Sequence, residues 1–513
     1  MRFTALLALL VVLTSCADGM RTDSTPEPNQ IVRLSDSEIK GLDPQKISDL
    51  SSLRVAADQF EGLTRHNAAG EIEPGLAKNW TVSSDGLKWT FVLRQNLQFS
   101  DGAPISAQLF SDLFDRLQNP ETASPTKALF ENIGSIKARN EQVVVSLNSP
   151  TPQLPDLLAH PALAAIPLHR IIQTGDAWVN DRPMVTSGAY QLERWLLNDH
   201  AKLTHNPNWH DDARLTKNII WKPMDDSLSG MRLFLAGGAD VTADYPPSRH
   251  QWLKKNHAKK VQNVPYLGSY YFAFNTRKPP FDDPRVRRAL SMAVEREWIA
   301  DKVIGVGNVP AWGLLPPGLV SDIGYLPEWS KWPRDRRLKA ARSLLAEAGY
   351  NAANPLRFEI RFNSSAEHRR VSVAMAAMWK ALGVEASLFN SEAALHFAAL
   401  RQHDFVLARS GWIADLPTPE NFLLVHQQAN GAGNYSGYGN LEYNAILAHA
   451  IAEPNSQKRK QLMSNAEKIL INDMPILPLY FYVTRSLVAE RIDGWENNIS
   501  NVHPSRTLRI KTK

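Results

Sequence analysis

Short apolar runs alternate with helical patterns along most of the chain. Residues 89–94 and 143–147 are strand-length runs bounded by turn residues, and residues 270–275 form an apolar run typical of a buried strand. Strands that alternate with helices favour a layered architecture in which helices cover sheets. The pattern therefore predicts an α/β fold.

Helical periodicity is clearest at residues 284–303. Apolar positions such as Val286 and Leu290 recur at the spacing of one helix face, and Pro284 suits the first turn. Three further elements are expected: a helix at 338–348 closed by Gly349, a helix at 371–382 closed by Gly383, and a strand at 384–388.

Length and charge narrow the class of protein. A chain of 513 residues exceeds one hydrophobic core, so we expect two or three domains. The chain shows no repeat of 20–50 residues, which argues against a solenoid or a propeller. The net charge is +5, from 57 basic and 52 acidic residues, with no run of five like charges. We therefore expect a mixed solvated surface and no nucleic-acid partner.

The single cysteine, Cys16, ends a short apolar segment. Residues 3–13 are apolar but too few to span a bilayer, and residues 13–16 resemble the lipobox of bacterial lipoproteins. This resemblance implies cleavage before Cys16 and lipidation of its thiol, which anchors the protein to a membrane. The alternative is an ordinary cleaved signal. We expect an exported protein on the periplasmic or cell-surface face of a membrane, tethered by residues 17–30.

The segment 408–422 places a cation and an anion six residues apart, with an indole between them. A free peptide carries one ammonium and one carboxylate. Asp415 is the candidate for the ammonium, through a charge-assisted hydrogen bond, and Arg409 for the carboxylate, through its planar fork of donors. An extended stretch of six residues spans roughly 20 Å, enough for the ends of a tripeptide of roughly 10 Å. Alternatively, both side chains pair with other protein groups.

The same segment offers backbone groups to a ligand. If it is extended, Gly411, Ile413 and Asp415 face one way, and their main chain can pair with a peptide as an added strand. Trp412 then walls a side-chain pocket or packs in the core. Main-chain pairing ignores side-chain identity, which suits a carrier of varied peptides.

Several stretches in the same order resemble the oligopeptide-binding proteins of bacterial ABC importers, in family 5 of the extracellular solute-binding proteins. The stretches, besides 408–422, are FEGL at 60–63, PGLA at 74–77 with Trp80, SDG at 84–86, FSDGAPISA at 99–107, NPETASP at 119–125, SGAY at 187–190, NPNW at 206–209 and KPPFDDPRVRRAL at 278–290. The resemblance runs from about residue 31 to the C-terminus.

The resemblance implies two α/β lobes joined by a hinge, with an extra third domain. The expected division is a lipoprotein signal peptide at 1–16, a tether at 17–30, lobe I at 31–62, 166–266 and 481–513, the extra domain at 63–165, and lobe II at 267–480. Chain crossings near Tyr266 and Tyr480 would form the hinge and permit rigid-body closure around a ligand.

The resemblance also suggests site residues. It assigns the peptide ammonium to Asp415 and the carboxylate to Arg409, and it places His368 where relatives contact the carboxylate of a longer peptide. Ser48 and Leu50 match a segment that lines the ligand cleft, although some relatives carry Glu at the position of Ser48. Gly268 and Ile413 occupy positions that are cysteines joined by a disulfide in certain relatives.

The function implied is capture of short peptides and their delivery to an ABC permease and its ATPase by a monomeric carrier. The alternatives are the same fold binding murein peptides, a metal chelate or another non-peptide solute, a secreted enzyme, and an adhesion or chaperone role. The 14 His residues are scattered without metal-ligand spacing, so we expect no metal and no cofactor. No nucleophile elbow, zincin helix or phosphate loop occurs, so we expect no enzyme.

Overall fold

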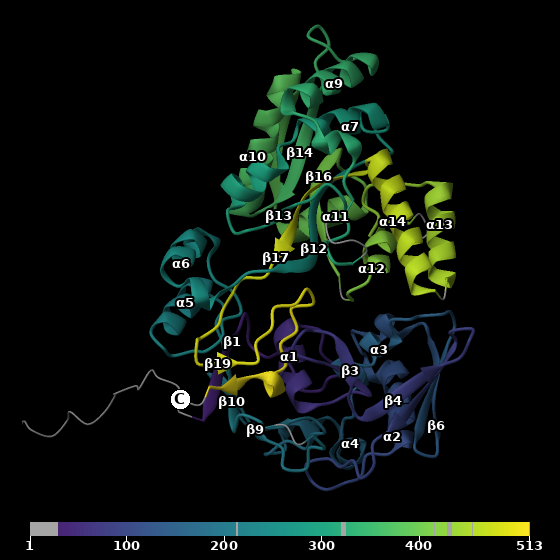
Figure 1. The fold of residues 1–513 in the computed structure, drawn as a ribbon, viewed down its shortest axis with the longest axis vertical. Coiled ribbons are helices and arrows are strands. Elements are labelled where there is room, and N and C mark those ends of the chain that lie inside the picture. The colour runs from purple at the N-terminus through teal and green to yellow at the C-terminus, as the bar shows by residue number, and fades with distance from the viewer. Residues whose placement is uncertain are drawn as a thin grey trace, which may run out of the picture.

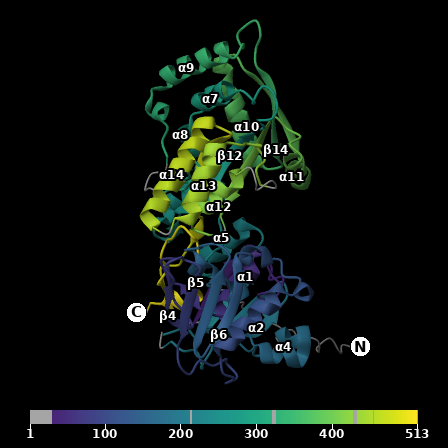
Figure 2. The same ribbon diagram turned by 90° about the vertical axis from the view of Figure 1, so that its right-hand side faces the viewer.

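A computed structural model describes residues 29–211, 214–319, 325–414, 416–427, 433–453 and 455–511. Cys16 and nearly all of the expected tether lie outside these ranges. The molecule consists of two bodies stacked along its long axis (Figures 1 and 2). In the described ranges, no helix combines the length and apolar character needed to cross a membrane.

Lobe I is built on a four-stranded sheet in the order β1-β10-β9-β8, in which β1 and β10 are parallel. Its strands are β1 (Gln30–Ser35), β10 (Asn218–Pro223), β9 (His200–His205) and β8 (Tyr190–Leu196). Its helices are α1 (Leu50–Gln59), α4 (Leu168–Thr174), α5 (Ser227–Leu235) and α6 (His250–Asn256). Two separate antiparallel pairs of short strands accompany this sheet: β11 (Val261–Gln262) with β18 (Ser486–Leu487), and β19 (Ile492–Asp493) with β20 (Arg509–Ile510).

A second four-stranded sheet in the same body is antiparallel throughout, in the order β4-β5-β7-β6. Its strands are β4 (Ala77–Val82), β5 (Lys88–Leu93), β7 (Gln142–Leu147) and β6 (Ile133–Arg139), beside the short pair β2 (Thr64–His66) and β3 (Ile72–Pro74). Helices α2 (Ala107–Gln118) and α3 (Leu154–Leu157) complete it. Alternate residues of β5 and β7, such as Phe91 and Val145, enter a core cluster of its own. The strands expected at 89–94 and 143–147 are confirmed.

Lobe II is built on a six-stranded mixed sheet in the order β13-β17-β12-β16-β14-β15. Its strands are β13 (Val309–Pro310), β17 (Ile476–Val483), β12 (Pro265–Phe274), β16 (Leu407–Ile413), β14 (Arg357–Asn363) and β15 (Glu385–Ser391). Its helices are α7 (Pro284–Ala293), α8 (Arg296–Trp298), α9 (Arg334–Glu347), α10 (Ala366–Trp379), α11 (Ala393–Arg401), α12 (Pro419–Leu423), α13 (Leu441–Ala452) and α14 (Ser456–Asp473). With these elements the α/β prediction is confirmed.

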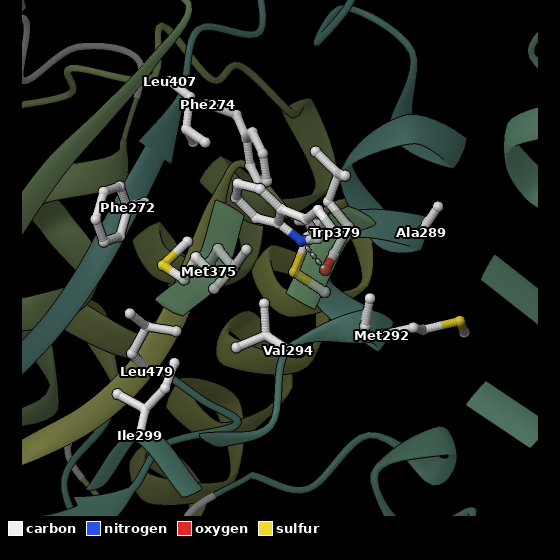
Figure 3. Packing of buried hydrophobic residues seen from close by; sticks show 14 of the residues in the cluster. Phe272, Phe274, Ala289, Met292, Val294, Ile299, Met375, Trp379, Leu407 and Leu479 are labelled. Atoms are coloured by element: carbon white, nitrogen blue, oxygen red, sulfur yellow. Dashed lines mark hydrogen bonds between the residues drawn. The ribbon is translucent and has the colours of Figure 1, made fainter. Parts of the chain in front are cut away.

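The core of lobe II is centred on aromatic residues. Trp379 of α10 is fully buried, and its indole Nε1 donates to Leu290 O at 2.9 Å (Figure 3). Phe272 and Phe274 of β12 join the same cluster. Rings of this size bury large apolar areas, and the indole N–H has the partner that burial requires. The cluster fixes α7 and α10 against the sheet that carries the site.

The helix expected at 284–303 is interrupted. The α-helix α7 ends at Ala293, Val294 is extended, and a π-helix covers Ile299–Ile304. The break carries Arg296 into the core, where it is fully buried and donates to the carbonyls of Ala311 and Pro478. A buried guanidinium needs such acceptors, and they lie on distant segments that the local pattern does not reveal. The other two helices and the strand at 384–388 are confirmed, with α9 and α10 starting a few residues earlier than expected.

The chain passes between the two bodies in strands that lie side by side. β12 and β17 are antiparallel neighbours from Pro265 opposite Val483 onward, and β11 pairs with β18 just before that point. Few crossings, paired with each other, allow one body to rotate on the other as a unit.

Glu467 of α14 is a buried carboxyl group in lobe II, and its ionisation should affect the stability of the protein. Its side chain has no exposed surface, and its Oε1 accepts from the backbone N–H groups of Leu314 and Leu315 at 2.8 Å each. Burial raises the pKa of Glu467 from 4.5 to about 7, against the effect of these hydrogen bonds. The native state therefore binds more protons than the unfolded state between these two values, so stability falls as pH rises through this window.

Glu467→Gln keeps an acceptor for both N–H groups and removes the ionisation. Its stability relative to the parent should rise by about 2–3 kcal/mol between about pH 5 and about pH 8, measured by urea unfolding. Glu442→Gln, at an exposed position of α13, is the control and should show no such rise. A Glu467→Gln difference that is the same at both pH values would contradict the buried ionisation.

Candidate functional site

A cavity of about 380 Å³ lies between lobe I and lobe II. On the lobe II side it is lined by the end of β16, by the segment that follows it and by one residue of β12. These residues are Ile413, then Ala414, Leu416 and Pro417, and Leu267, which lies opposite Ala414. Asp415 lies outside the described residues, but both of its chain neighbours line the cavity. This is the place for a ligand that contacts both lobes.

Helix α1 supplies one face to the lobe I side of the cavity. The lining residues Leu50, Leu53, Arg54, Ala57 and Asp58 follow the i, i+3, i+4, i+7, i+8 spacing of a single helix face. The helix starts where the Asp49 side chain accepts from Ser52 N at 2.9 Å. Leu50, the first residue of the helix, lines the cavity, and its side chain is 49% exposed. Ser48 is exposed before the helix and is not among the lining residues.

Arg409 lies on β16, four residues before Ile413. Its Nη2 donates to Tyr482 OH at 2.9 Å, its Nη1 to Asn363 Oδ1 at 3.4 Å, and its guanidinium carbon stands 4.8 Å from the centre of the Tyr270 ring. Its buried Nε has no acceptor among the described residues. No described carboxylate lies within ion-pair distance, so the charge is held by aromatic rings and neutral oxygens.

His368, near the start of α10, lies beside Arg409. Its Nδ1 is 3.2 Å from Tyr270 OH, so both side chains contact the same tyrosine. Burial lowers the pKa of His368 to about 3, and the positive charges of Arg409 and His396 add to the shift. His368 is therefore neutral at physiological pH. Its imidazole can donate a hydrogen bond to a bound carboxylate, and it can take up a proton when a carboxylate is bound beside it. The structure brings these two predicted residues together, but neither is among the residues that line the cavity in this arrangement of the lobes.

The outer edge of β16 is open beside the cavity. β12 pairs with β16 along its whole length, from Phe274 opposite Leu407 to Gly268 opposite Ile413. On the other side, β14 pairs only with Leu407 and Ala408 among the described residues. Beyond Ala408, β16 therefore has a free edge.

The backbone groups that point to this free edge can be identified from the register. Ala414 N donates to Leu267 O at 2.9 Å, so Ala414 and every second residue before it direct their backbone groups to β12. Arg409, Gly411 and Ile413 then direct theirs outward. In agreement, the carbonyl of Arg409 accepts from His396 Nε2 at 2.9 Å on that side. Gly411 and Ile413 are left to pair with another extended chain.

Trp412 faces away from Arg409. Its Nε1 donates to Asn421 Oδ1 at 3.0 Å, and it packs against a second lobe II cluster with Tyr271 and Leu447. Trp412 does not line the cavity, and its contacts are those of a side chain packed in the core. Gly268 and Ile413 are directly opposite in the β12–β16 register, which is the geometry that a bridge between these two positions needs.

Two of the sequence stretches meet in an ion network at one side of the cavity. Glu61 accepts from Trp209 Nε1 at 2.6 Å, from His210 Nε2 at 2.9 Å and from Arg65 at 3.3 Å. Burial alone would raise the pKa of Glu61, but the hydrogen bond from His210 and the charges of His210 and Arg65 hold it at about 2. Arg65 also pairs with Glu73 and Asp211 at 2.7 Å each. This network fixes the stretches 60–63 and 206–209 to each other and leaves Arg65 neutralised.

Sequence reasoning did not find the partners of Arg409. For the lobe I wall it named Leu50, which lines the cavity, and Ser48, which does not. Tyr482, Tyr270 and Asn363 come from three strands, and only the sheet register brings them to Arg409. The face of α1 could have been found from the spacing of Leu50, Leu53, Arg54 and Ala57. The described residues contain no cluster of three His, Cys, Asp or Glu side chains placed to hold a metal ion. The arrangement offers hydrogen-bond donors, a neutral imidazole and a strand edge, which are groups for binding.

Comparison with known proteins agrees with this geometry. The model of "Bacterial extracellular solute-binding proteins, family 5 Middle" matches residues 71–434. The chain is 32% identical to the periplasmic oligopeptide-binding protein OppA of Salmonella typhimurium, over 99% of this chain and 97% of that protein.

Two solved structures show how the lobes are arranged. The unliganded open form of the murein tripeptide-binding protein MppA overlays with a TM-score of 0.85 at 30% identity, covering 95% of this chain and 98% of that one. Haemophilus influenzae OppA in complex with RPPGFSPFR gives 0.73 at 29% identity, covering 95% and 99%. At nearly equal identity the open form fits better, so the lobes stand as in an open binding protein. The chain belongs to family 5 of the bacterial extracellular solute-binding proteins.

Proposed function

We propose that this protein binds short peptides between its lobes and delivers them to the permease of an ABC importer. The observation that carries the proposal is the free edge of β16 beside the interlobe cavity. A carrier of varied peptides must use groups that all peptides share, and a free strand edge binds the main chain without regard to side chains. The names of the relatives, an oligopeptide-binding and a murein tripeptide-binding protein, support the same class of ligand.

In this proposal the ends of the peptide are held by opposite charges. Asp415 takes the ammonium, because the residues on both sides of it line the cavity. Arg409 takes the carboxylate of a short peptide, because its charge has no described carboxylate partner. Closure of the lobes brings the cavity wall of lobe I over the strand edge and removes water from these ion pairs, which strengthens them.

His368 extends the carboxylate site. It is neutral without a ligand and shares Tyr270 with Arg409. Proximity of a peptide carboxylate would favour its protonated form, so the same pair of residues can accept ligands whose carboxylates lie at slightly different depths.

The proposed location is the outer face of a membrane. The resemblance of residues 13–16 to a lipobox supports lipidation at Cys16, which would keep the carrier near its permease.

Metabolic labelling with a radioactive fatty acid tests the lipidation of Cys16 directly. The parent protein should be labelled, and the Cys16→Ser variant should not.

A second candidate ligand class is the peptide of murein. The overlay with the open form of MppA favours it, since that protein is described as binding a murein tripeptide. Mass spectrometry of the small molecules released by denaturing the purified protein separates the candidates. Linear peptides support the proposal, peptides with γ-linked glutamate support the murein alternative, and release of a non-peptide solute alone would contradict both.

The role of Asp415 predicts a dependence on the free amino end of the ligand. Asp415→Asn should weaken the binding of a tripeptide by roughly 2–5 kcal/mol in calorimetry, because the ammonium would be enclosed without its counter-charge. For the parent, N-acetylation of the peptide should have a similar effect. Equal affinity for free and acetylated peptides would remove Asp415 from the site.

The role of Arg409 predicts a dependence on ligand length. Arg409→Ala should weaken the binding of tripeptides by at least about 2 kcal/mol and that of longer peptides less, because these place the carboxylate elsewhere. Arg401→Ala removes the same charge from an exposed position at the end of α11 and should change neither affinity. The same loss for Arg409→Ala at every peptide length would show that Arg409 supports the sheet and does not bind the carboxylate.

A further inference from the structure

The lobe I wall of the cavity contains four arginines, of which two form ion pairs with described carboxylates and two do not. The arginines that line it are Arg33, Arg54, Arg65 and Arg506. Arg65 and Arg506 are both in ion pairs with Glu73, at 2.7 and 3.2 Å. Arg33 and Arg54 have no ion pair with any described carboxylate. These two charges are therefore available to a ligand.

Arg33 is held rigidly with donors to spare. Its side chain is 5% exposed, its guanidinium carbon lies 4.3 Å from the centre of the Trp221 ring, and its Nη1 donates to Ser505 Oγ at 2.7 Å. Its buried Nε has no acceptor among the described residues. An unpaired donor on a buried cation is costly unless something accepts from it.

Asp58, one of the acids that line this wall, accepts its hydrogen bonds from other groups. Its Oδ2 accepts from Trp221 Nε1 at 2.9 Å and from Ser505 Oγ at 2.6 Å, and its Oδ1 accepts from Ser505 N at 3.0 Å. It attracts Arg33 from a distance without a direct ion pair. Arg54 is likewise attracted by Asp36 without a direct ion pair, so neither guanidinium is paired with a described carboxylate.

Arg54 and His503 complete the group. Arg54 comes from the cavity face of α1, and its charge reaches both Arg33 and His503. Burial lowers the pKa of Arg33 to about 10, and Arg54 adds to this shift against Asp58, so Arg33 remains charged at physiological pH. Burial with the same two arginines lowers the pKa of His503 to about 3, so His503 is neutral.

From this geometry we propose that Arg33 and Arg54 form an anion subsite in lobe I that binds a carboxylate on the ligand other than its C-terminal one. The subsite lies across the cavity from the strand edge of lobe II, where a side chain of an extended ligand points when it leaves the main chain on the lobe I side. Its ligand class is an acidic peptide, with the carboxylate on a glutamate or aspartate residue. The inference rests on the proposed function, because it assigns a preference within that site.

Matched tripeptides test the subsite. Three pairs carry glutamate or glutamine at the first, second or third position among alanines, and each is titrated calorimetrically into the ligand-free protein. At one position the parent should bind the glutamate peptide at least about tenfold more tightly than its glutamine partner, because a charge-assisted hydrogen bond replaces a neutral one. Arg54→Ala should abolish this preference, so that the glutamate peptide binds no more tightly than its glutamine partner.

Two controls keep the outcomes distinct. Arg232→Ala removes the same charge from an exposed position of α5 in the same lobe and should keep the preference. Arg54→Lys should keep part of it, since a point charge remains without the fork of donors. No preference for glutamate in the parent, or a preference that survives Arg54→Ala, would overturn the inference. An equal loss for all peptides would overturn it as well, by showing that Arg54 acts on lobe closure. If the parent binds none of the peptides, the proposed function fails, and this inference fails with it.

Discussion

The one-sided pairing of β16 is the constraint on which the site depends. β12 holds the strand along its full length and fixes which backbone groups point outward, while β14 leaves it after Ala408. An unsatisfied strand edge is normally covered or blunted, because it invites pairing with other chains. Here the edge borders a cavity between two lobes. In the proposed function, an edge that elsewhere promotes aggregation becomes the surface that binds the peptide.

The rest of the molecule positions that edge. The aromatic cluster around Trp379 fixes the sheet of lobe II against α7 and α10, and α10 brings His368 beside Arg409. The paired crossings β12 and β17 permit lobe I to move as a unit, and one face of α1 lines the cavity that Ile413 also lines. The ion network around Glu61 holds the lobe I wall together, so that the lobe closure of the proposed function would move a preformed surface. The proposed binding edge and the two chain crossings belong to the same sheet.

The sequence was a good guide to local elements and to family, and a weaker guide to long-range contacts. The strand patterns at 89–94 and 143–147 and the glycine-closed helices were predicted because their determinants are local. The break after Ala293 was missed because two acceptors of Arg296, the carbonyls of Ala311 and Pro478, lie on other segments of the chain. The pairing of Gly268 with Ile413 followed from resemblance alone. Tyr482 and Arg33 carry no local signal, since each reaches its place only when the sheets and lobes assemble, whereas Arg54 shares the helical spacing of the cavity face of α1.

Hydrogen exchange at single amides measures whether a ligand pairs with the free edge of β16. The amides of Gly411 and Ile413 should exchange rapidly in the ligand-free protein and become protected when a tripeptide binds, since they pair with its main chain. The amides of Ser410 and Trp412, which point to β12, should be protected in both states. Protection of Gly411 and Ile413 that does not change on saturation with a bound peptide would contradict the account.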